Sequence, residues 1–130
     1  MTTLLLDTHT YVWAVSAPDK LSHAARTVVA DRSNAVLISA ASVWEMAIKH
    51  RSGRWPEAEP LIRAHDSVVA RLGAETVPIT AEQAIRAGGL EWTHTDPFDR
   101  MLAAQALVLG ATLVSRDAAF GELLGLALLW

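Results

Sequence analysis

The sequence predicts an α/β fold in which a parallel β-sheet of about four to five strands is flanked by helices in three layers. Two observations lead to this class. Short apolar runs recur along the chain without the polar–apolar alternation that marks a half-exposed strand. Segments with helical patterning separate these runs, and strands that alternate with helices pair in parallel because each helix returns the chain to the same end of the sheet.

Five apolar runs are expected to form buried strands. Each run is continuous rather than alternating and is bounded by polar or turn residues, which is typical of a strand covered on both faces. The order of the strands in the sheet cannot be derived from the sequence. The runs are Leu4–Leu6, Ala35–Ile38, Thr76–Ile79, Ala111–Val114 and Leu126–Leu129.

Five segments between these runs are expected to be helices. Glycine and proline mark several of their ends: Gly73, Gly88 and Gly110 each follow a helical segment. The most loop-like stretch is Ser52–Pro60, because Gly53 and Pro56 interrupt it. The expected helices are His23–Ala30, Ala40–Arg51, Glu59–Leu72, Ala81–Ala87 and Phe98–Leu109.

Length and composition predict a single domain over residues 1–130, in which 52% apolar residues suffice for a packed core. The chain has no cysteine, which excludes disulfides and thiolate metal sites. Neither a signal peptide nor a membrane span is visible, so a cytoplasmic protein is expected. The net charge of −3 disfavours a nucleic-acid ligand, unless bound divalent cations reverse the sign locally.

Four acids are expected to meet at one edge of the sheet. Asp7 directly follows the first strand, and Asp117 follows the fourth after two residues. Glu45 lies in the early turns of the helix after the second strand, and Asp99 lies in the first turn of the helix before the fourth. Because covering helices run antiparallel to the strands, helix starts and strand ends share the edge where open α/β sheets bind ligands.

Each of these acids also has a purely structural interpretation. Asp7 and Asp117 are suited to cap helices. Glu45 could complete a capping box with Ser42, or pair with Lys49 one helical turn later. Taken singly, such roles are at least as common as functional ones.

The last helix shifts this balance. Asp96 and Pro97 have the pattern of a helix cap followed by a first-turn proline, and Asp99 would favour the positive end of the helix dipole. The remainder of Phe98–Leu109 is apolar nearly all round, which predicts burial and therefore a desolvated carboxylate. Several carboxylates at one buried edge repel one another unless a cation such as Mg²⁺ or Mn²⁺ joins them.

Four blocks of the chain resemble the PIN domain, and in particular the VapC-like ribonuclease toxins of type II toxin–antitoxin systems. The blocks agree with the family in residue type, order and spacing, and the resemblance covers essentially the whole chain. They are Leu4–His9, Ile38–Glu45, Asp96–Ala106 and Leu113–Asp117.

The resemblance implies a PIN-like fold and a magnesium- or manganese-dependent endoribonuclease that hydrolyses RNA phosphodiester bonds. It places catalytic and metal-binding roles on Asp7, Glu45, Asp99 and Asp117. It also implies a small cognate antitoxin that blocks the site, a homodimer, and an antitoxin groove formed by the expected helices Ala40–Arg51 and Glu59–Leu72.

Several further residues are candidates for supporting roles. Ser115 lies where the family often has a small hydroxyl residue, and Asp96 is an outer acid or a cap. Arg100 and Arg116 could hold phosphate oxygens, although salt bridges to the acids are equally compatible. His9 is expected at the surface, with a rim position as the alternative.

A basic run and five tryptophans complete the candidates for RNA contacts. The run comprises Lys49, His50, Arg51 and Arg54, which could follow an RNA backbone or simply complement a helix end. Tryptophans can stack on single-stranded bases, but core packing is expected for Trp13 and Trp44. The five tryptophans are Trp13, Trp44, Trp55, Trp92 and Trp130.

The sequence is also compatible with two other functions. An Asp-dependent phosphatase also places an acid after its first strand, but His9 occupies the second position of the usual D-x-D pair. A non-catalytic binding module would use the acids only as helix caps. No zinc-site, phosphate-loop or nucleophile-elbow motif is present.

Overall fold

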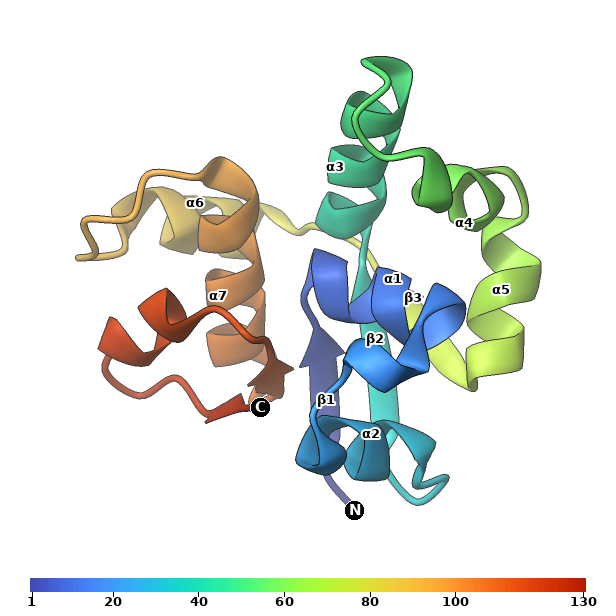
Figure 1. Cartoon of the computed structure of the whole chain (residues 1–130). Helices are drawn as coiled ribbons and strands as arrows, with labels where there is room; N and C mark the ends of the chain where they lie inside the picture. Colours follow the sequence, from blue (N-terminus) through green and yellow to red (C-terminus); the bar gives the residue numbers. More distant parts are fainter.

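The computed structural model describes residues 1–130 and contains a five-stranded, all-parallel sheet with the order β3-β2-β1-β4-β5 (Figure 1). The predicted α/β class is therefore confirmed, and β1 lies at the centre of the sheet. The strands are β1 (Thr3–Leu6), β2 (Ala35–Ser39), β3 (Ala74–Val77), β4 (Thr112–Val114) and β5 (Leu128–Leu129).

Seven α-helices and three short 3₁₀ helices connect and cover the strands. None of the helices is both long and apolar enough to pass through a lipid bilayer. The α-helices are α1 (Thr8–Ser16), α2 (His23–Ala30), α3 (Ala40–Arg51), α4 (Glu59–Arg63), α5 (His65–Leu72), α6 (Ala81–Gly89) and α7 (Pro97–Leu109). The 3₁₀ helices are η1 (Pro18–Lys20), η2 (Pro56–Ala58) and η3 (Ala118–Glu122).

The largest differences between the observed and the predicted elements concern α1, the α4–α5 segment and β3; in addition, β5 begins two residues later and α6 ends two residues later than expected. Helix α1 has no counterpart among the five expected segments. The expected helix Glu59–Leu72 is divided at Ala64, whose backbone leaves the helical region with φ −116° and ψ 37°. Strand β3 begins directly after Gly73 and ends before Pro78, two residues earlier than expected, because proline has no N–H to continue the ladder.

Two apolar clusters cover the two faces of the sheet. Alternate residues of β1 point to opposite faces, so Leu4 and Leu6 join one cluster whereas Leu5 joins the other. Figure 1 shows α1 with α3, α4 and α5 on one side of β1, and α6 with α7 on the other. This double coverage explains why the strands are continuous apolar runs in the sequence.

A buried chain of polar contacts joins the start of α3 to the middle of α7. The Ser39 hydroxyl, which caps α3, donates to the Gln105 Oε1. The Gln105 amide donates in turn to Gln83 Oε1 at 3.0 Å and to the Pro78 carbonyl at 3.2 Å. These hydrogen bonds hold the two helices that carry Glu45 and Asp99 in a fixed relation, and they satisfy the buried hydroxyl of Ser39 and the buried amide of Gln105.

Candidate active site

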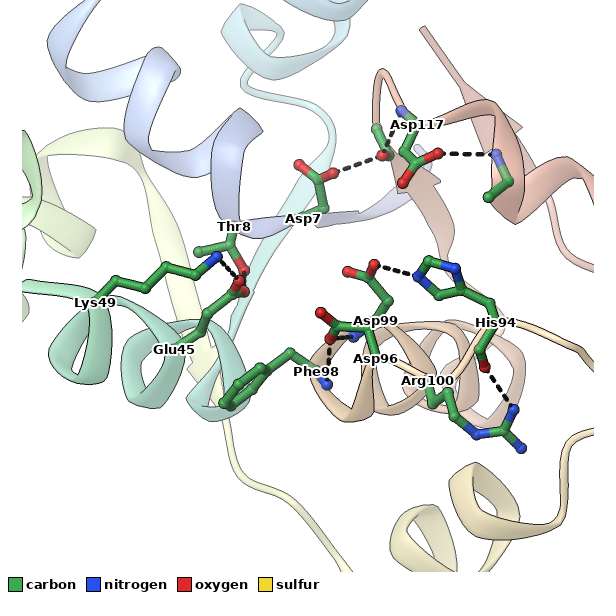
Figure 2. A network of polar contacts seen from close by, with 12 residues as sticks. Asp7, Thr8, Glu45, Lys49, His94, Asp96, Phe98, Asp99, Arg100 and Asp117 are labelled. Carbon is green, nitrogen blue, oxygen red and sulfur yellow. Dashed lines mark hydrogen bonds and ion pairs between the residues drawn. The ribbon is translucent and has the colours of Figure 1, made fainter. Parts of the chain in front are cut away.

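The four predicted acids line one small pocket at the carboxyl edge of the sheet (Figure 2). The pocket has a volume of about 150 Å³ and no hydrophobic lining residue. The expectation that strand ends and helix starts converge here is thus met by the geometry. The lining residues are Asp7, Thr8, His9, Glu45, Lys49, Asp96, Asp99 and Asp117.

Asp7 occupies the turn between β1 and α1 and is only 8% exposed. Its Oδ1 accepts a hydrogen bond from the Thr10 backbone N–H at 2.8 Å, so it does cap α1. Its Oδ2 accepts a hydrogen bond from the Ser115 hydroxyl at 2.5 Å. Capping therefore fixes the orientation of this carboxylate and does not remove it from the pocket.

Ser115 links two of the acids. In addition to its bond to Asp7, its Oγ accepts a hydrogen bond from the Asp117 backbone N–H at 3.0 Å. Asp117 is exposed and caps η3, with its Oδ1 accepting from the Ala119 N–H at 2.9 Å. The supporting position that the family resemblance implies for Ser115 agrees with these contacts.

Glu45 is the most buried of the four acids, at 5% exposure. The Thr8 hydroxyl donates to its Oε1 at 2.6 Å, and the Lys49 ammonium contacts its Oε2 at 2.5 Å. The predicted pairing of Glu45 with Lys49 across one helical turn is confirmed. This ammonium is the cation that offsets the charge of a carboxylate held out of water.

The predicted capping box from Ser42 to Glu45 is wrong. Helix α3 begins at Ala40, and its cap is Ser39, whose hydroxyl accepts from the Ala41 N–H. Ser42 is instead a buried residue inside the helix, with its Oγ 3.0 Å from the Thr8 Oγ1. Glu45 consequently has no capping role that would account for its burial.

Asp99 lies in the first turn of α7 behind the cap predicted at Asp96. The Asp96 Oδ1 accepts from the backbone N–H groups of Phe98 and Asp99 at 2.8 and 3.1 Å. Burial raises the pKa of Asp99 above its ordinary value, and Asp96 and Glu45 act in the same direction. A hydrogen bond from His94 opposes this shift but does not cancel it.

His94 is a site residue that the sequence analysis did not identify. Its Nε2 donates to the Asp99 Oδ2 at 2.7 Å, and one ligand atom each from His94, Asp99 and Asp117 lie within 4.8 Å of one another. The zinc-type motif, which places two histidines on one helix, does not include His94. The signal that was available is the position of His94 five residues before Asp99, in the loop that leads into α7.

Arg100 does not face the pocket, so the predicted phosphate-binding role is wrong, and so is the alternative of a salt bridge to the acids. Figure 2 shows its guanidinium turned away from the carboxylates, beside the carbonyl of His94. The guanidinium donates to five backbone carbonyls in and after α6. Their residues are Ala87, Gly88, Leu90, Trp92 and His94.

The other cationic and aromatic candidates fall in different places. Arg116 is exposed beside Asp117 and lines a second cleft next to the pocket. Of the basic run, only Lys49 reaches the pocket. Trp13 packs against the core as expected. Trp44 was expected there too, but it is 60% exposed, because the buried face of α3 is formed by Ala41, Ser42, Glu45 and Met46.

The donor set fits a hard divalent cation. Five carboxylates line the small pocket, those of the four predicted acids and of Asp96; the lining contains no sulfur ligand, and hard cations prefer oxygen. Burial raises the pKa of Asp99, and the neighbouring carboxylates of Asp96 and Glu45 raise it further, so its ionised form is disfavoured in the protein alone. Lys49 is the only lysine or arginine that lines the pocket. A cation among the acids would supply the missing compensation.

Comparison with protein families and curated proteins identifies relatives of this chain. A model of the PIN domain matches residues 4–124. Ribonuclease VapC22 of Mycobacterium tuberculosis is 31% identical over 118 residues, which cover 90% of this chain and 88% of that protein. Ribonuclease VapC16 of the same organism is 39% identical over 59 residues, or 45% of this chain and 40% of that protein.

Solved structures share the fold across nearly the whole chain. DNA-bound VapBC from Salmonella typhimurium superposes with a TM-score of 0.72 at 20% identity, covering 99% of this chain and 98% of that one. VapBC2 from Rickettsia felis, bound to a promoter DNA fragment, gives a TM-score of 0.70 at 18% identity, with 98% of each chain covered. VapC20 of Mycobacterium tuberculosis, a toxin that cleaves the sarcin–ricin loop, gives 0.62 at 16% identity, covering 95% of this chain and 98% of that one.

Proposed function

This chain belongs to the PIN domain family, and from that membership we propose that it is an endoribonuclease, the toxin of a toxin–antitoxin pair. The observation that carries the proposal is the convergence of Asp7, Glu45, Asp99 and Asp117 on one pocket. These acids come from four separate elements. Helix capping alone would not bring all four together, and Glu45 caps nothing.

We further propose that the four carboxylates hold Mg²⁺ or Mn²⁺. When bound, such a cation supplies activation of a water molecule and stabilisation of the charge that develops on the phosphate. The chain has no cysteine and no serine lines the pocket, and the one hydroxyl that does line it, that of Thr8, donates its proton to Glu45 in a hydrogen bond. Hydrolysis of the phosphodiester bond by water is the chemistry that this donor set supports.

The residues around the acids fix their orientation before any ligand arrives. Ser115 and Thr8 each donate a hydrogen bond to one carboxylate, which holds Asp7 and Glu45 in place. His94 does the same for Asp99. Orientation of this kind matters because a small misplacement of ligands reduces both metal affinity and rate.

Cleavage of RNA by the purified protein tests the proposal. We expect cleavage of single-stranded RNA with Mg²⁺ or Mn²⁺, loss of cleavage in EDTA, and recovery when metal is restored. The Asp7→Asn protein, purified in parallel, controls for contaminating nucleases: Asn can still accept from Thr10, so it should fold but not cleave. Cleavage that persists in EDTA, or equally in Asp7→Asn, would contradict the proposal. Turnover of a phosphate monoester without RNA cleavage would favour the phosphatase alternative.

The proposed partners are an antitoxin and a second copy of this chain. The proposed substrate is RNA, and the proposed location is the cytoplasm. The antitoxin groove was predicted between α3 and the α4–α5 segment. An apolar cleft of about 400 Å³ does border α4 and α5, but α1 forms its other wall and α3 contributes no lining residue. The α1 side is therefore the better location for the antitoxin segment. Light scattering of the chain, alone and with its antitoxin, tests the expected homodimer.

A further inference from the structure

A second cleft opens beside the acidic pocket. It has a volume of about 420 Å³ and lies between the start of α1 and the turn that leads from β4 into η3. It shares three lining residues with the pocket, namely Asp7, His9 and Asp117. A molecule seated in this cleft would therefore extend directly from the carboxylates. The remaining lining residues are Trp13, Arg116 and Ala118.

One wall of the cleft is aromatic and is fixed by packing. The His9 ring lies 5.6 Å from the Trp13 ring and 4.7 Å from the Trp55 ring, measured between centroids. Trp13 also contacts Trp130 at 6.0 Å and packs against the apolar core. His9 is exposed and Trp13 is half-buried, so part of this aromatic surface faces the cleft. Ordered aromatic rings are the platforms on which single-stranded bases stack.

The cleft also contains a cation without a protein partner. Arg116 is exposed, forms no ion pair and donates no side-chain hydrogen bond in the structure. Its sequence neighbour Asp117 directs its Oδ1 to a backbone N–H instead. A free guanidinium matches the geometry of phosphate oxygens better than a lysine ammonium does.

We propose that this cleft is a substrate subsite for the nucleotide that adjoins the cleaved bond. Its base stacks on His9 and Trp13, and its phosphate contacts Arg116. The ligand is single-stranded RNA, because bases inside a duplex are stacked on one another and do not reach an aromatic wall. This inference rests on the proposed ribonuclease function and adds to it the residues that select and position the substrate.

The experiment is an abasic scan of a short oligoribonucleotide that the parent protein cleaves at one bond. Each substrate lacks the base at one position, and single-turnover rates are measured with excess Mn²⁺. We expect one position next to the cleaved bond to lose about 5- to 150-fold in rate, the range for removal of one stacked base. In Trp13→Leu and His9→Ala, removing that base should cost little more, because the stacking partner is already absent.

Binding without chemistry provides the second measurement. Anisotropy of the same labelled oligonucleotide in EDTA should show weaker binding by Trp13→Leu, His9→Ala and Arg116→Ala. The Arg116 variant should also reduce the slope of log affinity against log salt by about 0.7, the value for one phosphate contact to a single strand. Arg86→Ala, a change at an exposed residue of α6, is the matched control and should bind like the parent.

The two levels of inference fail differently. If the parent cleaves RNA but no abasic position depends on Trp13 or His9, the subsite is refuted and the ribonuclease proposal stands. If the parent cleaves no RNA, both are refuted. Trp13→Leu keeps an apolar side chain against the core, and a normal melting temperature shows that it is folded. Should it fail to fold, the exposed residues His9 and Arg116 decide the question.

Discussion

Replacement of Asp99 by asparagine separates a metal-binding carboxylate from a helix-stabilising one. Asp99 lies in the first turn of α7, where a negative charge interacts favourably with the helix dipole and stabilises the helix by about 0.3–1 kcal/mol. If that were its whole effect, Asp99→Asn would destabilise the protein by this amount. The structure predicts otherwise, because burial raises the pKa of Asp99 and Asp96 and Glu45 raise it further. In metal-free protein the variant should be as stable as the parent or more stable.

Metal should reverse this order. A ligand that binds only the folded state at 100 times its dissociation constant stabilises it by about 2.7 kcal/mol. For a chain of this length that corresponds to a rise in melting temperature of roughly 8–14 °C. The parent should show this rise with excess Mg²⁺ or Mn²⁺. Asp99→Asn should show a much smaller rise, since it has lost one of the four charged ligands proposed for the metal.

Thermal melts of both proteins, each in EDTA and in excess metal, provide the four values needed. Asp66→Asn is the matched control, because Asp66 is also an acid in the first turn of a helix but is exposed and does not line the pocket. It should lose a few tenths of a kcal/mol in both conditions and keep the full response to metal. A variant at Asp99 that is weakened in EDTA and responds fully to metal would refute the reasoning.

Four further predictions follow from the same contacts. In EDTA, the raised pKa of Asp99 means that the contribution of this carboxyl to stability is complete below the ordinary carboxyl pKa and is lost as the pH rises through the folded-state pKa. Thermal melts at several pH values should show that the parent loses stability over this interval whereas Asp99→Asn does not. Parallel curves for the two proteins would contradict this prediction. Arg100→Ala should lower the free energy of unfolding by about 3 kcal/mol, because the hydrogen bonds from its charged guanidinium to several carbonyls are lost. An unchanged denaturation midpoint would show that these hydrogen bonds do not stabilise the protein. Ser115→Ala should reduce kcat more than KM, because it releases Asp7 without touching the RNA; an effect on KM alone would oppose this role. His94→Gln should weaken Mn²⁺ binding measured by calorimetry, and unaltered binding would show that Asp99 needs no positioning.

The sequence was sufficient to predict the parallel sheet and the edge at which the acids meet. Continuous apolar runs are a direct consequence of a sheet covered on both faces, as for Leu4, Leu5 and Leu6. The position of an acid just after a strand or at a helix start then follows from chain direction alone. Such an inference needs no knowledge of side-chain packing. For this reason the convergence of Asp7 and Asp99 was predictable although the strand order was not.

What the sequence did not reveal depends on contacts between distant segments. The role of Arg100 could not be predicted, because its five carbonyl partners come together only when the loop after α6 folds back around the guanidinium. The cap of α3 was misplaced because Ser39 and Ser42 are both plausible caps, and only the end of β2 decides between them. Trp44 was expected in the core, yet the register of α3 buries Glu45 and turns Trp44 outward.

The bond from Ser115 to Asp7 spans 108 residues and has a consequence for the moment at which activity first arises. During synthesis the chain emerges from its N-terminus, so Asp7 leaves the ribosome long before Ser115 and Asp117. Strand β1 is central, and its pairing with β4 closes the sheet only after residues 112–114 are available. Nascent and prematurely terminated chains therefore lack the fourth acid and the hydroxyl that orients the first. The pocket of four acids is therefore complete only after Asp117 has been translated and β4 has paired with β1.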